Sequence, residues 1–246
     1  MSGHSKWKNI MHKKEKTDAQ RAKVFTKIGK EMAIAVKEGG PDPVSNAKLR
    51  DLIAKAKANN VPNDNIERVI KKASGADAVA YEEIVYEGYG PSGVAVIVEA
   101  ATDNKNRTAG EVRHYFDKFG GKLGVTGSVS FMFSSKGVII VAENDEYGDK
   151  VVDGDQLMED ALECGAADFA EEDGLYEIYT EPDDLSAVCE DLEKKGYKFE
   201  SAEVEKVPAT YVSLTTDDDR KFMNLLLENL EEDEDIVNVW HNWDEE

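Results

Sequence analysis

The chain has little of what builds metal centres, disulfide frameworks or membrane spans. Of its 246 residues only 2 are cysteine and 4 are histidine. Cys164 and Cys189 are not arranged as a Cys-x-x-Cys or Cys/His motif, which favours thiols in a reducing compartment over a metal site or a disulfide. No apolar run approaches the roughly 20 residues that span a bilayer, and the first residues lack the apolar stretch of a signal peptide. We therefore expect a cytoplasmic protein with no membrane contact.

Positive charge is scarce after residue 75. Residues 1–75 contain 17 Lys and Arg against 8 Asp and Glu, whereas residues 76–246 contain 13 against 43. The first segment therefore carries +9 and the remainder −30, within a net charge of −21. A basic segment joined to an acidic body can bind a polyanion while the body is repelled by it. We expect the lysines of the first segment to be open to solvent.

The basic segment has the pattern of three helices. Thr17 to Gln20 form a capping box for the first helix, and Gly39-Gly40-Pro41 ends it. Two more helices are predicted at about 45–58 and from Pro62 to Gly75, so residues 1–79 are predicted to form a basic three-helix bundle. In the first helix, apolar residues recur every three or four positions on one side. Lysines fall on the opposite side: Lys23, Lys27, Lys30 and Lys37.

From about residue 81 the pattern changes to strands that alternate with helices. Residues 80–133 are predicted to form β-β-α-β with the last strand at 129–133, and residues 208–246 to add β-α-β. Residues 134–207 give β-α-β-β-α-β by themselves. Because the tail is too small to stand alone, we expect it to combine with residues 80–133. The predicted fold is α+β: a helical bundle followed by two ferredoxin-like α/β domains, the acidic one (134–207) inserted into the other.

The N-terminal arm combines lysines with an aromatic ring and small polar groups. Lysines pair with phosphate, and a tryptophan can stack on an unpaired base, so the arm has the components of RNA recognition. A solvated basic tail is the alternative. The arm's candidate nucleic-acid contacts are His4, Ser5, Lys6, Trp7, His12, Lys13 and Lys14, joined by Lys23, Lys27 and Lys30 of the first helix.

A second candidate contact lies in the first α/β domain. Asn104, Lys105, Asn106 and Arg107 open a predicted helix, where free N–H groups and the helix dipole favour an anion. The glycine-rich loop that follows this helix, from Gly120 to Ser128, lacks the Gly-Lys-Ser/Thr end of a nucleotide-binding loop. Its glycines permit close backbone approach to a partner, although a plain turn is equally compatible with them. Its candidate contacts are Gly121, Lys122 and Gly124.

No group of residues predicts catalysis. His114 lies in the middle of a predicted helix beside Arg113, as expected of a surface ion pair, and His241 has no nucleophile at useful spacing. The acidic run at 231–235 lacks the alternation of a calcium loop and is read as a solvated face or helix cap. We therefore predict no catalytic residues, no metal and no cofactor.

Several segments, in order along the chain, resemble the YebC family: Gly3 to Trp7, Val61 to Arg68, Tyr86 to Pro91, Thr102 to Thr108, and Gly120 to Val129. The resemblance implies a helical domain followed by two α/β domains, and no enzymatic activity. Members of this family carry the label of probable transcriptional regulators. Other members, including a mitochondrial translational activator of cytochrome c oxidase subunit I, resemble ribosome-associated translation factors that help ribosomes through stretches such as proline runs.

The sequence and the resemblance together predict a monomeric, non-enzymatic translation factor. Its basic helical domain would bind the ribosome through rRNA, with tRNA as a further RNA partner. The alternative is a DNA-binding transcriptional regulator, which is expected to have a base-reading helix and usually to be a dimer. Neither a base-reading helix nor a dimer is evident from the sequence. The basic segment is dominated by lysine, which mostly contacts phosphate.

Overall fold

The computed structural model describes residues 18–76, 78–145, 147–172 and 174–244. The fold is mixed α+β, as the sequence predicts, with seven α-helices and antiparallel sheets in those ranges. The described chain divides into two compact units: residues 133–209 belong to one, and residues 18–132 and 210–243 belong to the other. The division into a bundle and two α/β domains at the predicted boundaries stays a prediction. No described helix is long and apolar enough to cross a membrane.

The basic segment folds into three helices that share one core. These are α2 (Asp18–Gly39), α3 (Ala47–Ala58) and α4 (Asn63–Ala73). The buried side chain of Asn46 caps α3, because its Oδ1 accepts from the Leu49 N–H at 3.0 Å. Its Nδ2 donates to the Ala35 and Gly40 carbonyls at 2.8 Å each, which ties the end of α2 to the start of α3. The core consists of Ile28, Met32, Ala35, Val36, Leu49, Leu52, Ala56 and Ile66.

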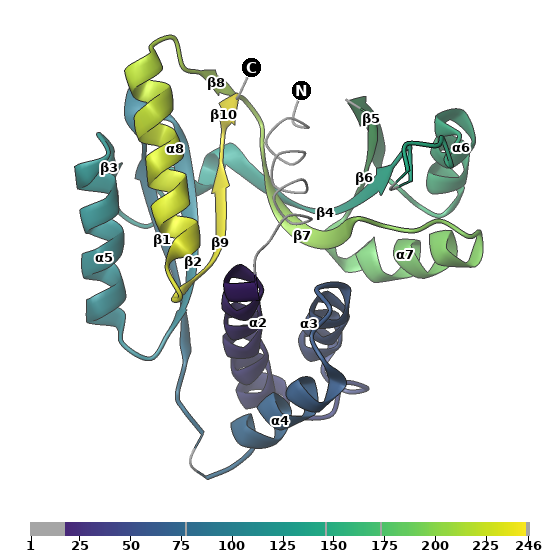
Figure 1. The fold of residues 1–246 in the computed structure, drawn as a ribbon, viewed down its shortest axis with the longest axis horizontal. Coiled ribbons are helices and arrows are strands. Elements are labelled where there is room, and N and C mark those ends of the chain that lie inside the picture. The colour runs from purple at the N-terminus through teal and green to yellow at the C-terminus, as the bar shows by residue number, and fades with distance from the viewer. Residues whose placement is uncertain (1–17, 77, 146, 173, 245–246) are drawn as a thin grey trace. The chain divides into compact units, whose positions relative to one another are not determined.

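The same unit contains a four-stranded antiparallel sheet of order β3-β1-β2-β9. Its strands are β1 (Glu82–Tyr89), β2 (Ala95–Thr102), β3 (Lys122–Leu123) and β9 (Ile236–His241). Helices α5 (Lys105–Lys118) and α8 (Asp217–Glu232) lie side by side on one face of this sheet (Figure 1). A 3₁₀ turn, η1 (Pro91–Gly93), joins β1 to β2, and two short strands, β8 (Val212–Ser213) and β10 (Trp243–Asp244), complete the elements near the C-terminus.

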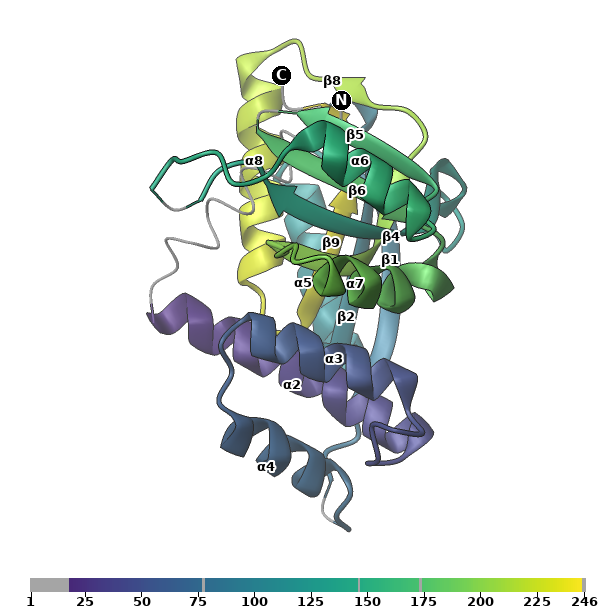
Figure 2. The same ribbon diagram turned by 90° about the vertical axis from the view of Figure 1, so that its right-hand side faces the viewer.

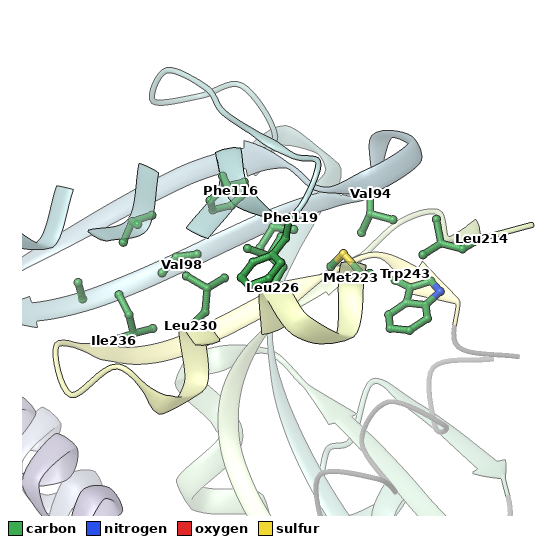
Figure 3. Packing of buried hydrophobic residues seen from close by; sticks show 13 residues of the cluster. Val94, Val98, Phe116, Phe119, Leu214, Met223, Leu226, Leu230, Ile236 and Trp243 are labelled. Carbon is green, nitrogen blue, oxygen red and sulfur yellow. The ribbon is translucent and has the colours of Figure 1, made fainter. Parts of the chain in front are cut away.

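Alternate residues of β2 face the two helices because successive strand side chains point to opposite sides of a sheet. Figure 3 shows Phe119, which follows α5, above Leu226 of α8, with Val98 near Leu230 and with Met223 beside Trp243. All of these side chains are buried. The core therefore joins segments that lie about 130 residues apart in the chain.

The predicted strand at 129–133 is wrong. Residues 130–132 form a 3₁₀ turn, η2 (Ser130–Met132), and the third strand of the sheet is Lys122–Leu123, which pairs with Tyr89 and Gly88. The apolar run at 129–133 resembles a strand, but the N–H groups of Val129 and Ser130 donate to the carboxylate of Glu87. Backbone donors used by a side chain are not available to a strand partner.

The second unit has the predicted order of elements. These are β4 (Phe133–Ala142), α6 (Gly154–Glu163), β5 (Asp168–Glu172), β6 (Leu175–Thr180), η3 (Pro182–Asp184), α7 (Leu185–Lys194) and β7 (Ser201–Pro208). The strands form one antiparallel sheet of order β5-β6-β4-β7. Helices α6 and α7 cover one face of it (Figure 2), where Leu157, Val188 and Leu192 pack on Ile139 and Ile178.

Candidate nucleic-acid interface

Part of the predicted interface lies outside the described residues, and for this part the sequence predictions stay predictions. It is the N-terminal arm with His4, Ser5, Lys6, Trp7, His12, Lys13 and Lys14.

The lysines of α2 contact the C-terminal end of α8. Lys23 Nζ donates to the Glu232 carbonyl at 3.3 Å, and Lys27 Nζ donates to the Glu231 carbonyl. Carbonyls at the end of a helix lack partners within the helix and carry the negative end of its dipole, so cations stabilise them. The lysine side of α2 therefore caps a helix of the same chain.

Lys30 is the most buried of the three α2 lysines that contact this end of α8. Its Nζ donates to the Glu234 carbonyl at 2.9 Å and to Asp235 Oδ1 at 2.7 Å, and the exposed fractions of the Lys30 and Asp235 side chains are only 11% and 6%. The prediction that Lys30 faces solvent is wrong, because the acidic turn after α8 covers it. The run at 231–235 was expected to be a solvated face or a helix cap, and the solvated face is wrong at Asp235 for the same reason.

Asp235 is the centre of a buried polar network. Besides Lys30, it accepts from Arg107 at 2.6 Å, from Thr108 Oγ1 at 2.9 Å and from Thr102 Oγ1 at 3.1 Å. Burial acts to raise the pKa of Asp235, but the hydrogen bonds from Lys30, Arg107 and Thr108 outweigh it and hold the pKa well below its usual range. The carboxylate is therefore ionised and fully engaged at neutral pH.

The start of α5 was predicted to bind an anion through four residues. Two of them, Lys105 and Arg107, form ion pairs with carboxylates of the same chain. Asn104 caps the helix by accepting from the Arg107 N–H at 3.1 Å. The Arg107 guanidinium donates to Asp235 and, at 2.9 Å, to Asp103, and both bonds raise its pKa. Lys105 forms an ion pair with Glu82, and Asn106 is exposed. An anion arriving here would compete with carboxylates of the same chain.

The glycine-rich loop uses its glycines for contacts within the fold. A Cβ on Gly121 would lie 2.6 Å from the Tyr89 carbonyl oxygen, and one on Gly124 would lie 2.5 Å from Ser128 Oγ. Both positions therefore need glycine so that the loop can approach β1 and its own next turn. Lys122 lies on β3 and is exposed.

Exposed cations gather on the other two helices of the bundle, where no site was expected from the sequence. Arg50 and Lys57 lie two turns apart on α3, and Arg68, Lys71 and Lys72 share the C-terminal half of α4. Among the described residues, none of the five has a carboxylate within salt-bridge distance. The signal was present in the sequence, because Arg68, Lys71 and Lys72 fall on the side of α4 opposite the buried Ile66, and Arg50 and Lys57 fall beside the apolar stripe of α3. We call these five residues the α3–α4 cations.

A pocket of about 290 Å³ lies between α2 and α4. Phe25, Ile66 and Val69 give it apolar walls, and Tyr81 adds an aromatic ring. Arg68 and Lys72 also line it, so two of the α3–α4 cations border an apolar space. Such a pocket can hold a planar apolar group whose attached charge is negative.

Three acidic side chains lie close enough together to suggest a metal site. Ligand atoms of Glu111, Asp233 and Asp235 lie within 4.8 Å of one another. Asp235 already pairs with two cations, which would repel a divalent ion. Tyr115 donates to Asp233 at 3.2 Å, and burial together with the charge of Asp233 raises the pKa of Tyr115 to about 12. We assign no metal to this group.

Comparison with known proteins gives the family of the chain. The family model described as TACO1/YebC protein N-terminal domain matches residues 5–76, and the model described as TACO1/YebC second and third domain matches residues 81–243. The chain belongs to the TACO1/YebC family. The resemblance deduced from the sequence motifs is thus confirmed.

Relatives within the TACO1/YebC family span almost the whole chain. A protein of Acetivibrio thermocellus is 62% identical over 244 residues, covering 99% of each chain. One of Caldicellulosiruptor bescii is 57% identical over 247 residues, covering 100% of this chain and 99% of the other. Both are named probable transcriptional regulatory proteins. The crystal structure of a conserved hypothetical protein from Aquifex aeolicus is similar at 43% identity, with a TM-score of 0.83 over 93% of this chain and 92% of that one.

Proposed function

We propose that this TACO1/YebC protein is a non-enzymatic translation factor that binds structured RNA of the ribosome through its helical domain. In this role it would aid elongation through difficult stretches such as proline runs. The observation that carries the proposal is the set of α3–α4 cations, which are exposed and have no carboxylate partner among the described residues. Phosphate contacts supply much of the affinity of proteins for nucleic acids. A bundle followed by two ferredoxin-like domains, one inserted into the other, is the arrangement we propose to present them.

The pocket beside α4 favours RNA over duplex DNA. RNA loops and bulges offer unpaired bases that can leave the stack and enter an apolar pocket, whereas a base of duplex DNA is stacked and paired. A base in the space lined by Phe25 and Val69 would place its phosphates near Arg68 and Lys72. The α2 lysines contribute less than the sequence suggested, because they contact the end of α8.

A second candidate is a DNA-binding transcriptional regulator. The specific observation in its favour is the name of the relatives, which are called probable transcriptional regulatory proteins. The two candidates share the α3–α4 cations but differ in the nucleic acid. Duplex DNA recognition requires base contacts in a groove, and most such proteins bind as dimers with matched half-sites.

The first experiment tests the α3–α4 cations. Arg68→Glu with Lys72→Glu should lower the affinity for a labelled RNA hairpin about tenfold or more and flatten its dependence on salt, because two phosphate contacts are lost. The control is Lys198→Glu with Lys221→Glu, which makes the same change of charge at two exposed lysines outside the bundle. Equal affinities of the two double variants would show that the effect is one of net charge and would refute the assignment to α4.

The second experiment separates the two candidate functions. Lysate is sedimented through a sucrose gradient with and without ribonuclease, and the purified protein is titrated with the RNA hairpin and with duplex promoter DNA. Migration with ribosomal particles that ribonuclease abolishes, and that the α4 double variant loses, would support the translation factor. Free migration together with sequence-dependent binding of the DNA would support the transcriptional regulator.

A further inference from the structure

Glu87 is a buried carboxylate whose role is not obvious from the sequence. It lies on β1 and is only 4% exposed. Its Oε1 accepts from the Gly127 N–H at 2.7 Å, and its Oε2 accepts from the N–H groups of Val129 and Ser130 at 2.8 Å each. One side chain thus satisfies three backbone donors of a loop that lies about 40 residues later in the chain. We call residues 121–131 the Glu87-held loop.

The charge of Glu87 is what holds this loop. Burial acts to raise the pKa of Glu87, but the hydrogen bonds from Gly127, Val129 and Ser130 outweigh it and keep the pKa below its usual value. The ionised carboxylate has acceptors only, which suits three converging N–H donors. Two further bonds secure the loop: the Tyr89 hydroxyl donates to the Ser128 carbonyl at 3.0 Å, and the Gly124 N–H donates to the Glu87 carbonyl at 2.8 Å.

The Glu87-held loop carries apolar side chains that it does not bury. Val125 is 77% exposed and Phe131 is 76% exposed, although both sit in a loop tied down at several points. A buried carboxylate holds this loop in one conformation. If the loop served folding alone, we would expect Phe131 to pack against the core instead of facing solvent. Single exposed apolar residues are common on protein surfaces, and it is their place on one loop held at several points that distinguishes Val125 and Phe131. Lys122, at the start of the loop, adds an exposed cation.

We propose that the Glu87-held loop is a preformed platform for single-stranded RNA, on which the Phe131 ring stacks on an unpaired base and Lys122 contacts the adjoining phosphate. Aromatic side chains stack on every base, and a nearby cation follows the backbone, so this pair of groups fits single strands in particular. Glu87 is a positioning residue, because it touches the loop and not the RNA. The inference rests on the proposed function, since it adds a second RNA contact to that of the α3–α4 cations.

The direct test is Phe131→Ala. Its affinity for a labelled ten-residue oligouridylate should fall about fivefold or more, the usual effect of losing one stacked base. The control is Tyr147→Ala, which removes another exposed aromatic ring and should leave the affinity unchanged. Because Phe131 is exposed, thermal unfolding should also be unchanged. Equal affinities of wild type and Phe131→Ala would overturn the proposal.

The positioning role of Glu87 has a readout of its own. Glu87→Gln replaces one acceptor oxygen by an N–H donor, which would face N–H donors of the loop. Amide hydrogen exchange at Gly127, Val129 and Ser130 should speed up at least tenfold, and the oligouridylate affinity should fall with it. Glu228→Gln, an exposed site on α8, is the control. Unchanged exchange at the three amides would refute the role of Glu87, and Phe131→Ala tests the platform even if Glu87→Gln does not fold.

The outcome also separates this inference from the proposed function. Loss of RNA binding in Phe131→Ala but not in the α4 double variant would leave the loop as an RNA contact and remove the α3–α4 cations. The reverse result would remove the loop and keep the cations. If Phe131→Ala bound RNA normally but no longer bound ribosomal proteins after ribonuclease treatment, the loop would contact protein, and the RNA platform would be refuted.

Discussion

Replacing Lys30 by Met tests whether the lysine side of α2 is used for structure. The substitution keeps an unbranched side chain but removes the ammonium group that bonds Asp235 Oδ1 at 2.7 Å and the Glu234 carbonyl at 2.9 Å. Asp235 stays buried and keeps Arg107 and Thr108 as donors. The variant therefore leaves a buried carboxylate with one of its two cations.

The expected loss of stability follows from this geometry. Removing one partner of a buried ion pair typically costs about 3–5 kcal/mol, because the remaining charge is left without compensation. Since Arg107 still pairs with Asp235, we expect the lower part of that range or slightly less, about 2–3 kcal/mol. For a chain of this size each kcal/mol shifts the melting temperature by about 2–4 °C, so the shift should be about 4–12 °C.

Tryptophan fluorescence during urea unfolding can measure this loss of stability in the structural unit that contains α2. Trp240 and Trp243 lie in the unit that contains α2, and residues 133–209 contain no tryptophan. Trp7 lies outside the described residues, so it is replaced by Phe in every protein compared. Lys37→Met, an exposed site on the same helix, should stay within about 0.5 kcal/mol of wild type. A loss below about 1 kcal/mol in Lys30→Met would contradict this prediction, because it would mean that the buried pair adds almost nothing to stability. A double variant with Asp235→Asn should recover part of the loss.

Two further predictions concern acid and a helix cap. Because the folded pKa of Asp235 lies below its unfolded value, its stabilisation is complete above about pH 5 and is lost as pH falls below about 4. Urea midpoints measured from pH 7 to pH 3 should therefore fall less steeply in Asp235→Asn, and an equal slope would contradict this. Asn46→Ala removes a cap and two buried donors, which should cost about 1–3 kcal/mol in urea unfolding. Asn63→Ala, an exposed residue at the start of α4, should cost much less, and similar losses in both variants would argue against the cap.

Helices were predicted well because their signals are local. The Gly39-Gly40-Pro41 stop agrees with the end of α2 at Gly39, and Pro62 lies directly before α4. Each of these signals acts within a few residues of the chain. The strand at 129–133 was predicted wrongly because its backbone donors bind Glu87, and no local pattern could reveal an acceptor some 40 residues earlier.

For the candidate site, too, local features were predicted correctly and contacts with distant segments were not. Lysines opposite an apolar stripe were expected to face solvent, and the helical period was enough to predict which side of α2 they occupy. What that side contacts could not be predicted, because the acidic turn that covers Lys30 lies about 200 residues further along the chain. Charge and helical period are properties of the chain, whereas the pairing of a charge depends on which distant segment the hydrophobic core brings to it. The α3–α4 cations stay exposed because, among the described residues, the fold brings no carboxylate to them.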